Sequence, residues 1–388
     1  MQYIKRDIEE CLAFMATKFP VITLTGPRQS GKSTLVRHVF PERKYVSCED
    51  PDVALFARDD PRDFLRVYEG AVIDEAQKVP DIFSYIQTVV DENDLPGQFV
   101  LTGSSDFLLF EKISQSLAGR AGVLTLLPFA LSEIHAAAGF KDFEQYLFTG
   151  LYPRIYKMNI LPGDFYPSYV RTYVERDVRL LKNILDLEQF QLFVKLCAGR
   201  IGQLLNLSSL ANDCGISHNT AKSWIGVLEA SYIVFLLQPH HMNFNKRLVK
   251  MPKLYFYDPG LAAYFLGIQT SDQLKTHFAK GALFESFILS ELIKHNYNQG
   301  KPANFYFWRD KNGNEIDCLI DEGETLLPME IKAGRTITRD YFKGVDYFSK
   351  LAGERALKPR IVYGGDEVQR RSNAQVVSWK KVGASLSG

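Results

Sequence analysis

The chain has 388 residues, 46% of them apolar and 23% charged, which is the composition of a globular protein with ample core. This length predicts two to four domains rather than one. The 46 Lys and Arg residues nearly balance 45 Asp and Glu residues, so the net charge of +1 excludes a bulk field that attracts polyanions. The five cysteines are scattered and include no CxxC pair, which argues against a disulfide framework or a zinc site.

The N-terminal segment MQYIKRDIEE carries charges where a secretory leader needs an apolar core. Farther along, no apolar run approaches the roughly 20 residues that a membrane helix needs. We therefore expect a cytoplasmic protein with no membrane partner.

The first third of the chain alternates strand and helix patterns. VITLTG is a short apolar strand, and a glycine-containing loop joins it to a helix from Lys32 to about Phe40. Further short strands are expected at residues 44–50, 71–76, 97–105 and 123–129. Because these runs are mostly apolar without alternation, they predict an α/β fold with a parallel sheet that is covered on both faces.

The rest of the chain is expected to form three segments. Residues 140–199 have helical spacing and indicate a small helical subdomain. Between Leu207 and Tyr257, a helix-turn-helix pattern precedes two strand-like runs. A last α/β segment starts near Lys280, with a helix at 281–297 and strands at 304–309, 314–320, 326–333 and 356–364.

The sequence GPRQSGKS, from Gly26 to Ser33, fits the phosphate-binding pattern G-x-x-x-x-G-K-[ST]. It lies between a strand and a helix, where its backbone N–H groups can point at phosphates. Gly26 and Gly31 allow the backbone to fold around them. Lys32 is predicted to reach the β- and γ-phosphates, and Ser33 to offer its hydroxyl to Mg²⁺. The pattern therefore predicts ATP and Mg²⁺ as cofactors.

AVIDEA is an apolar strand that ends in two acids, roughly forty residues after the phosphate loop. This is the Walker B pattern. Asp74 is predicted to hold Mg²⁺ through water, and Glu75 to orient or deprotonate the attacking water. An Asp-Glu pair at a strand end can also cap a helix, but its place beside the phosphate loop favours the catalytic interpretation.

With these two motifs the chain resembles the AAA+ superfamily, and more narrowly the prokaryotic AAA-type ATPases with a C-terminal domain of uncertain function. The resemblance covers essentially the whole chain. It implies an α/β architecture of four parts: a P-loop parallel-sheet core at 1–139, a helical lid at 140–199, a winged helix at 200–272 and a restriction-endonuclease-like domain at 273–388.

The resemblance also implies roles for individual residues. The nucleotide contacts fall on the phosphate loop and its helix, at Gly26, Pro27, Arg28, Gln29, Ser30, Gly31, Lys32, Ser33 and Thr34. LTGSS resembles a sensor-1 region, with either Thr102 or Ser104 as the hydroxyl that senses the γ-phosphate. Arg120 is the candidate arginine finger, and acting in trans it implies a homo-oligomer; its alternative is an ordinary ion pair. A sensor-2 arginine remains open between Arg171 and Arg176.

The helix-turn-helix has a predicted buried stripe of Ala221, Trp224, Ile225 and Leu228, with Ser217 as N-cap. Its exposed face carries one lysine and one glutamate, which suits DNA reading poorly. The following strand-turn-strand is richer in charge, and Lys246, Arg247, Lys250 and Lys253 are predicted to form a basic wing over a phosphate backbone. The alternative is a winged helix that only packs between domains or protomers.

Two C-terminal strands, NEIDCLI and LLPMEIKA, are joined by the hairpin turn DEGET. With a turn centred on Glu322-Gly323, Asp317 is expected opposite Pro328 and diagonal to Glu330. Diagonal neighbours lie roughly 7–8 Å apart, which allows two carboxylates to share a metal ion. Lys332 is expected on the same face as Glu330.

These residues resemble the D-(x)n-E-x-K pattern of PD-(D/E)XK nucleases. On that resemblance Asp317 and Glu330 bind Mg²⁺, Lys332 positions or activates water, and Glu285 matches the acid that the fold often carries on the preceding helix. The alternatives are surface acids with a Lys-Glu ion pair, or an inactive relic of the nuclease fold.

Taken together, these patterns predict an ATP-binding and ATP-hydrolysing AAA+ protein that acts on DNA, with metal-dependent DNA cleavage as a further predicted activity. The alternative function is an ATP-gated regulatory switch that binds a protein partner and carries an inactive nuclease-like domain.

Overall fold

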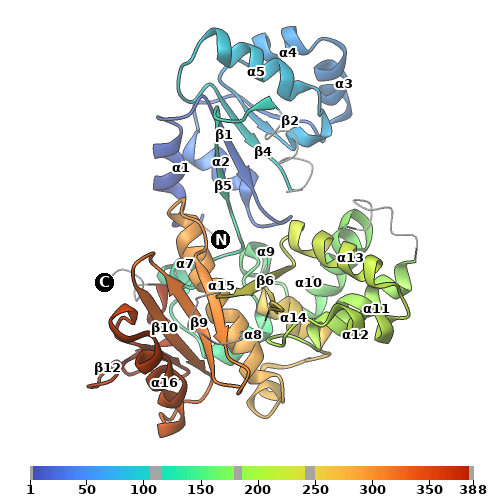
Figure 1. Cartoon of the computed structure of the whole chain (residues 1–388). Coiled ribbons are helices and arrows are strands. Elements are labelled where there is room, and N and C mark those ends of the chain that lie inside the picture. The colour runs from blue at the N-terminus through green and yellow to red at the C-terminus, as the bar shows by residue number, and fades with distance from the viewer. Residues whose placement is uncertain (1–2, 105–115, 179–185, 241–249, 384–388) are drawn as a thin grey trace. The chain divides into compact units, whose positions relative to one another are not determined.

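The computed structural model describes residues 3–104, 116–178, 186–240 and 250–383, apart from the side chains of residues 175–178 (Figure 1). The chain divides into two compact units. The N-terminal unit comprises Met1–Glu133, Ala230–Tyr232 and Asn296–Pro302, and the C-terminal unit comprises Ile134–Glu229, Ile233–His295 and Ala303–Gly388. Each unit contains its own sheet.

The N-terminal unit contains a five-stranded parallel sheet with the strand order β2-β3-β4-β1-β5. Its strands are β1 (Val21–Thr25), β2 (Tyr45–Ser47), β3 (Val72–Asp74), β4 (Phe99–Thr102) and β5 (Ala121–Thr125). Its helices are α1 (Glu9–Met15), α2 (Lys32–Val39), α3 (Pro51–Asp59), α4 (Pro61–Val67) and α5 (Ile82–Glu92). The predicted α/β fold with a parallel sheet is confirmed.

Local sequence signals define the first residues of α3 and α4. Asp50 accepts hydrogen bonds from the backbone of the first turn of α3, and Asp60 does the same for α4. Each is followed by a proline, at Pro51 and Pro61, whose fixed φ suits the first helical position. These caps end one helix and begin the next within two residues, so α3 and α4 form a compact pair.

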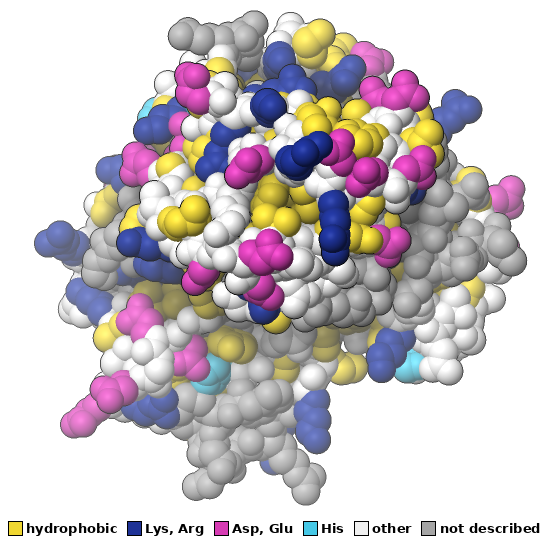
Figure 2. Space-filling view, turned by 90° about the horizontal axis from the view of Figure 1, so that it is seen from above, with side chains coloured by type: hydrophobic (Ala, Val, Ile, Leu, Met, Phe, Trp, Pro, Cys, Tyr) yellow, Lys and Arg dark blue, Asp and Glu magenta, His cyan; other side chains and the backbone are white. Residues whose placement is uncertain are grey.

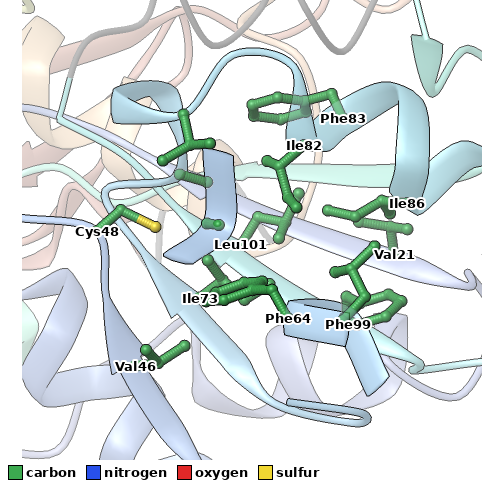
Figure 3. Packing of buried hydrophobic residues seen from close by; sticks show 14 of the residues in the cluster. Val21, Val46, Cys48, Phe64, Ile73, Ile82, Phe83, Ile86, Phe99 and Leu101 are labelled. Carbon is green, nitrogen blue, oxygen red and sulfur yellow. The ribbon is translucent and has the colours of Figure 1, made fainter. Parts of the chain in front are cut away.

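Apolar side chains cover both faces of the parallel sheet. On one face, residues of α3, α4 and α5 pack on the strands; Figure 3 shows Phe64, Ile82, Phe83 and Ile86 together with Val21, Ile73, Phe99 and Leu101. On the other face, α1 and α2 contribute Leu12 and Leu35, which pack with Ile22, Leu24, Val72 and Val100. Burial on both sides explains why the strands show no polar alternation.

The C-terminal unit begins with helices. They are α7 (Leu131–Ala138, which starts in the N-terminal unit), α8 (Phe143–Thr149), α9 (Pro153–Met158), α10 (Pro162–Tyr169), the π-helix η2 (Val170–Val178), α11 (Leu187–Ala198), α12 (Leu207–Cys214), α13 (His218–Ala230) and α14 (Pro259–Phe265). The expected helical character of 140–199 is confirmed for the described part.

The helix-turn-helix consists of α12 and α13. Asn206 caps α12, and Gly215 ends it in the left-handed conformation that glycine adopts without strain. Ser217 accepts a hydrogen bond from Thr220 N, as predicted for the N-cap of α13. The predicted stripe of Ala221, Trp224, Ile225 and Leu228 is buried. Two antiparallel strands follow, β6 (Val234–Pro239) and β7 (Lys253–Phe256).

The second sheet has eight strands in the order β12-β13-β11-β10-β9-β8-β6-β7 and mixes parallel with antiparallel pairs. Its remaining strands are β8 (Phe305–Arg309), β9 (Glu315–Asp321), β10 (Leu326–Lys332), β11 (Arg360–Tyr363), β12 (Gln369–Arg370) and β13 (Gln375–Ser378). Helices α15 (Lys280–Asn298) and α16 (Lys343–Ala352) accompany them. Sequence patterns did not predict that β6 pairs in parallel with β8 and so joins the helix-turn-helix strands to the C-terminal sheet.

On the face shown in Figure 2, positively and negatively charged side chains are intermixed among the residues that are not drawn in grey. This mixture is consistent with the net charge of +1. Among the described residues, no helix combines the length and apolar character needed to cross a membrane.

Candidate nucleotide site and acid–lysine cluster

The phosphate loop lies between the end of β1 and the start of α2. At Gly26, with φ of 136°, a Cβ atom would lie 2.1 Å from the carbonyl oxygen of Leu126. Gly31 precedes α2 with φ of 98°. Both positions therefore require glycine. Gln29 also has a positive φ, of 62°, so the loop is curved along its whole length.

Lys32 is buried at the base of this loop, and its amine donates to the carbonyl oxygens of Gly26 and Pro27, both at 2.9 Å. Burial lowers the pKa of Lys32 to about 8. Among the described residues it forms no ion pair with either acid of the Walker B strand. The carbonyl oxygens of Gly26 and Pro27 accept hydrogen bonds from the lysine, and the nearby charges of Glu75 and Asp74 also act on it.

Asp74, at the end of β3, accepts hydrogen bonds from three hydroxyl groups. Ser33 donates to Oδ2 at 2.8 Å, Tyr45 donates to the same oxygen, and Thr102 donates to Oδ1. The structure thus brings together Ser33, Asp74 and Thr102 as the sequence predicted. Tyr45 was missed, because a tyrosine at the start of a strand carries no nucleotide-site signal.

Glu75 follows in the left-handed conformation, with φ of 53°. Its Oε2 accepts a hydrogen bond from Ser104 at 2.9 Å and another from Gln77. The two sensor candidates therefore contact different acids: Thr102 binds Asp74, whereas Ser104 binds Glu75. A strained backbone at a non-glycine residue is typical of a functional position.

Ser33 and Asp74 fit a magnesium ion. Both offer oxygen, which a hard cation prefers, and their oxygens already lie 2.8 Å apart. Asp74 lies at the carboxyl end of β3, on the buried side of the site. The donor set is therefore suitable for the ion that accompanies ATP.

The other loop residues differ in their surroundings. Arg28 lies 3.7 Å from Glu49, and Thr34 is exposed on α2. The hydroxyl of Ser30 is buried and has no hydrogen-bond partner within the described ranges. Pro27 contributes the backbone oxygen that holds Lys32.

Arg6 holds the loop from behind, and sequence reasoning missed it. Its guanidinium donates to the carbonyl oxygens of Ser30 and Leu127, both at 2.8 Å, and to Glu133 at 3.0 Å. Arg6 and Glu133 are both buried. Glu133 also accepts hydrogen bonds from the backbone N–H groups of Asp7 and Ala130. No spacing rule connects residue 6 with residue 133, so only the fold reveals this contact.

Arg120 forms a two-pronged ion pair with Asp91 of α5, and its Nη1 donates to the carbonyl oxygen of Ala118 at 3.1 Å. This is the ion pair that the sequence left as the alternative to an arginine finger. The pair is solvent-exposed, so it contributes little to stability and leaves the arginine available. Of the sensor-2 candidates, Arg171 lies exposed on η2, and the side chain of Arg176 lies outside the described residues.

The register of β9 and β10 differs from the expected one. Leu326 pairs with Asp321 and Met329 with Cys318, so the next pair in this register is Asp317 with Glu330. The expectation that Asp317 lies opposite Pro328 was wrong by two residues. The turn closes with Glu322 N donating to Thr325 O, so its centre is Gly323-Glu324 rather than Glu322-Gly323. The two acids are direct rather than diagonal neighbours.

Six charged residues of the C-terminal unit form what we call the acid–lysine cluster: Lys253, Glu285, Glu315, Asp317, Glu330 and Lys332. Lys332 Nζ lies 3.0 Å from Asp317 and 2.6 Å from Glu330. Lys253 Nζ lies 3.2 Å from Glu285 and also pairs with Glu315. Each lysine thus bridges two carboxylates.

Burial and the charge of Asp317 raise the pKa of both Glu285 and Glu330. The pKa values of Lys253 and Lys332 are raised as well, because their carboxylate neighbours outweigh the effect of burial. Among the residues that the structure describes, none is a hydrogen-bond partner of the buried Glu330 Oε2.

This arrangement does not fit a bound magnesium ion. The carboxylate oxygens are suitable ligands, but the amine of Lys332 already lies between Asp317 and Glu330. Within the described ranges, no three His, Cys, Asp or Glu side chains are grouped to hold a metal ion. The lysines supply the positive charge that a cation would otherwise bring.

Lys253 corrects the predicted basic wing. It is buried within the acid–lysine cluster and does not face solvent. Lys250 is exposed, whereas Lys246 and Arg247 lie outside the described residues. The sequence pattern could not separate Lys253 from its neighbours, because all four lie in one basic stretch.

Three family profiles match successive parts of the chain. Residues 18–135 match an AAA domain, residues 140–272 a domain of unknown function (DUF8612) and residues 280–382 another domain of unknown function (DUF4143). An uncharacterized protein of Mycobacterium tuberculosis is 29% identical over 367 residues, which cover 93% of this chain and 80% of that protein. An uncharacterized protein of Methanocaldococcus jannaschii is 22% identical over 382 residues, covering 87% of this chain and 82% of that protein.

Two solved structures match parts of the chain at low TM-scores. The Walker-type ATPase of Pyrococcus abyssi is 17% identical, with a TM-score of 0.43, over 68% of this chain and 96% of that one. AMPPCP-bound DnaA of Aquifex aeolicus is 14% identical, with a TM-score of 0.28, over 57% of this chain and 85% of that one. Along its length the chain is therefore similar first to an AAA domain and then to the DUF8612 and DUF4143 domains.

Proposed function

We propose that the protein binds ATP with Mg²⁺ and hydrolyses it at the phosphate loop. The observation that carries this proposal is the hydrogen bond of 2.8 Å between Ser33 and Asp74. It brings the last residue of the phosphate-loop motif to the first acid of the Walker B strand, beside the buried amine of Lys32.

Each residue has a distinct role in this proposal. The backbone N–H groups from Arg28 to Ser33 surround the phosphates. Lys32 leaves the carbonyl oxygens of Gly26 and Pro27 and contacts the phosphates instead. Ser33 and Asp74 would hold the magnesium ion, which neutralises phosphate charge when bound. Glu75 orients or deprotonates the attacking water, and Ser104 and Gln77 fix its carboxylate.

Two substitutions test the ATPase proposal by separating binding from turnover. Lys32→Ala should abolish nucleotide binding, because it removes the cation nearest the phosphates. Glu75→Gln should retain binding and block turnover, because only the partner of the water is lost. Calorimetric titration with ATP and a phosphate-release assay measure the two effects. Unchanged steady-state hydrolysis in Glu75→Gln would contradict the catalytic role of Glu75.

DNA is the proposed partner of this ATPase. The support is the helix-turn-helix of α12 and α13, followed by the β6–β7 strand pair and the exposed Lys250. In this arrangement α13 presents few positive charges, so we expect binding with little sequence preference. The discriminating measurement is ATP turnover with and without duplex DNA. If DNA neither binds nor changes turnover, an ATP-gated switch with a protein partner becomes the better proposal.

Metal-dependent DNA cleavage by the acid–lysine cluster remains a separate prediction. The placement of Asp317 beside Glu330 matches the nuclease motif, but the amine of Lys332 lies between the two acids, so the described arrangement favours an ion-paired binding module over cleavage. The test incubates the protein with single-stranded, duplex and branched DNA and Mn²⁺. Asp317→Ala and Lys332→Ala serve as controls, since a contaminating nuclease survives both. If no substrate is cut and calorimetry detects no metal binding that depends on Asp317, the cluster is structural.

A further inference from the structure

A second basic site lies on the N-terminal unit, outside the phosphate loop. A pocket of about 440 Å³ is lined by Arg37, Phe40, Pro41, Arg43, Tyr45 and Val72. Arg37 comes from the last turn of α2, and Tyr45 begins β2. Two guanidinium groups and two aromatic rings therefore border one open cavity.

Aromatic rings hold both guanidinium groups in place. Arg37 lies over the ring of Tyr45, 3.6 Å from its centroid, and Arg43 lies 5.0 Å from the centroid of Phe40. Arg43 also donates to the carbonyl oxygen of Gly70 at 3.2 Å. Stacking and a backbone contact orient the planar groups without neutralising them.

Neither guanidinium has a carboxylate partner within the part of the chain that the structure describes. Arg66 and Arg120 of the same unit, in contrast, form ion pairs with Asp63 and Asp91. Burial also lowers the pKa of Arg43, which means that its positive charge is poorly solvated. An anion that enters the pocket would gain from both uncompensated charges.

The pocket is connected to the nucleotide site through Tyr45. The ring of Tyr45 carries Arg37 on the pocket side, and its hydroxyl donates to Asp74, the proposed magnesium residue. Arg37 is also one helical turn after Ser33 on α2. A ligand that draws Arg37 away from the ring therefore acts on the group that positions Asp74.

We propose that this pocket binds the phosphate group of a second ligand, which is distinct from the hydrolysed ATP, and that Tyr45 transmits its binding to Asp74. Two guanidinium groups with planar donors suit the tetrahedral oxygens of a phosphate. The phosphate can come from a nucleic-acid strand or from a free phosphate compound. Because the pocket does not share the residues of the phosphate loop, its binding can be measured without hydrolysis.

The first experiment measures binding in the Lys32→Ala protein, so that failure of the ATPase proposal does not affect it. The probes are a fluorescent single-stranded oligonucleotide, dT20, and inorganic pyrophosphate. Arg37→Gln with Arg43→Gln should weaken binding at least fivefold. For dT20, the slope of log affinity against log salt should fall by about 1.4, because each lost single-strand phosphate contact contributes about 0.7.

Matched variants control for folding and for general charge. Arg62→Gln with Arg66→Gln removes two arginines of α4 that do not line the pocket. Arg37→Lys with Arg43→Lys retains both charges and should preserve most of the salt slope. Loss of affinity for both probes supports a general phosphate site, and loss for dT20 alone supports a nucleic-acid site. Unchanged affinity, or an equal loss in the α4 control, would overturn the proposal.

The second experiment tests the connection to Asp74 in the protein with an intact phosphate loop. Tyr45→Phe removes the hydroxyl that donates to Asp74 but keeps the ring under Arg37. It should bind dT20 as the parent does, yet lose any change in ATP turnover that dT20 causes. If dT20 changes turnover equally in the parent and in Tyr45→Phe, the transmission through Tyr45 is wrong.

Discussion

The nucleotide site and the acid–lysine cluster contain the same kinds of residue but keep them in opposite states. In the N-terminal unit, backbone carbonyl oxygens hold Lys32, and hydroxyl groups hold Asp74. In the C-terminal unit, Lys332 bridges Asp317 and Glu330 directly. Lysine and acid are kept apart in the first site and paired in the second.

This difference has a physical consequence for ligand binding. An anionic ligand and its cation can enter the nucleotide site by replacing hydrogen bonds to uncharged groups. Entry of a cation into the acid–lysine cluster must break ion pairs between groups that are buried or half-buried. The state of the lysine therefore distinguishes a site that is prepared for a ligand from one that already has its charges compensated.

The largest expected effect distinguishes the acids of the two regions. Glu75→Gln should lower the rate of ATP turnover by roughly 10²–10⁴-fold, the usual contribution of a general base. Glu330→Gln, an equally conservative change of a buried glutamate, should leave turnover unchanged. A steady-state phosphate-release assay measures both. Similar losses in the two variants would show that the sites are not functionally separate.

The next largest effect concerns the support of the phosphate loop. Arg6→Ala leaves Glu133 buried without its partner, which should cost about 3–5 kcal/mol of unfolding free energy. The Michaelis constant for ATP should rise as well, because Arg6 holds the carbonyl oxygen of Ser30. Denaturant unfolding and ATP kinetics measure the two effects.

The controls for Arg6 are provided by the same segment. Lys5→Ala removes a neighbouring exposed cation and should change neither quantity. Arg6→Ala combined with Glu133→Gln removes the buried charge and should recover part of the stability. An Arg6→Ala protein with parental stability and kinetics would contradict the proposed support.

A smaller effect is expected on the stability of the protein when the pH changes, and it arises from the acid–lysine cluster. Burial and Asp317 raise the pKa of Glu330 from 4.5 to about 8. A carboxyl group whose pKa is raised by folding contributes stability that is complete below pH 4.5 and is lost as pH rises through 8. The melting temperature should therefore fall between about pH 4.5 and 8, by roughly 2–4 °C per kcal/mol lost, with no further change from this group at higher pH.

Glu330→Gln tests this assignment, because its amide does not ionise. In the presence of a chelator, melting curves of this variant should depend less on pH than those of the parent. Glu324→Gln provides a matched control, since Glu324 is an exposed acid in the nearby turn. Equal pH dependence in the parent and in Glu330→Gln would remove Glu330 as the cause.

The smallest expected signal is a partial rescue by subunit mixing. If Arg120 acts on the nucleotide of a neighbouring subunit, a mixture of Arg120→Ala and Lys32→Ala proteins should regain a fraction of ATP turnover. Asp91→Ala frees Arg120 from its exposed ion pair and should retain turnover. No rescue at any mixing ratio, with a monomer in ultracentrifugation with ATP, would count against a trans arginine finger.

The motifs of the candidate nucleotide site could be located from the sequence because their signals are local. Gly26, Gly31 and Lys32 lie within one loop, and Asp74 and Glu75 end one apolar strand. The pattern missed Arg6 and Tyr45, whose roles depend on contacts with Glu133 and Asp74 far along the chain. Local spacing contains no information about such pairs.

The C-terminal cluster was predicted less accurately for two physical reasons. A different turn centre moved the register by two residues, which kept Asp317 and Glu330 on one face but made them direct neighbours. The sequence pattern assigned Lys253 to a basic wing. Its burial depends on the packing of β7 near α15, which the pattern does not contain. The sequence shows that residue 253 is a lysine within a basic stretch, but it does not show which side chains surround that lysine.

The parallel pairing of β6 with β8 also has a consequence for synthesis of the chain. Pro239 finds its partner Phe307 roughly 70 residues later. At a translation rate of about 5–20 residues per second, the ribosome takes about 4–14 s to make that interval. Until then the edge of β6 that later pairs with β8 is open, so the nascent protein exposes backbone groups on which a strand of another chain could pair.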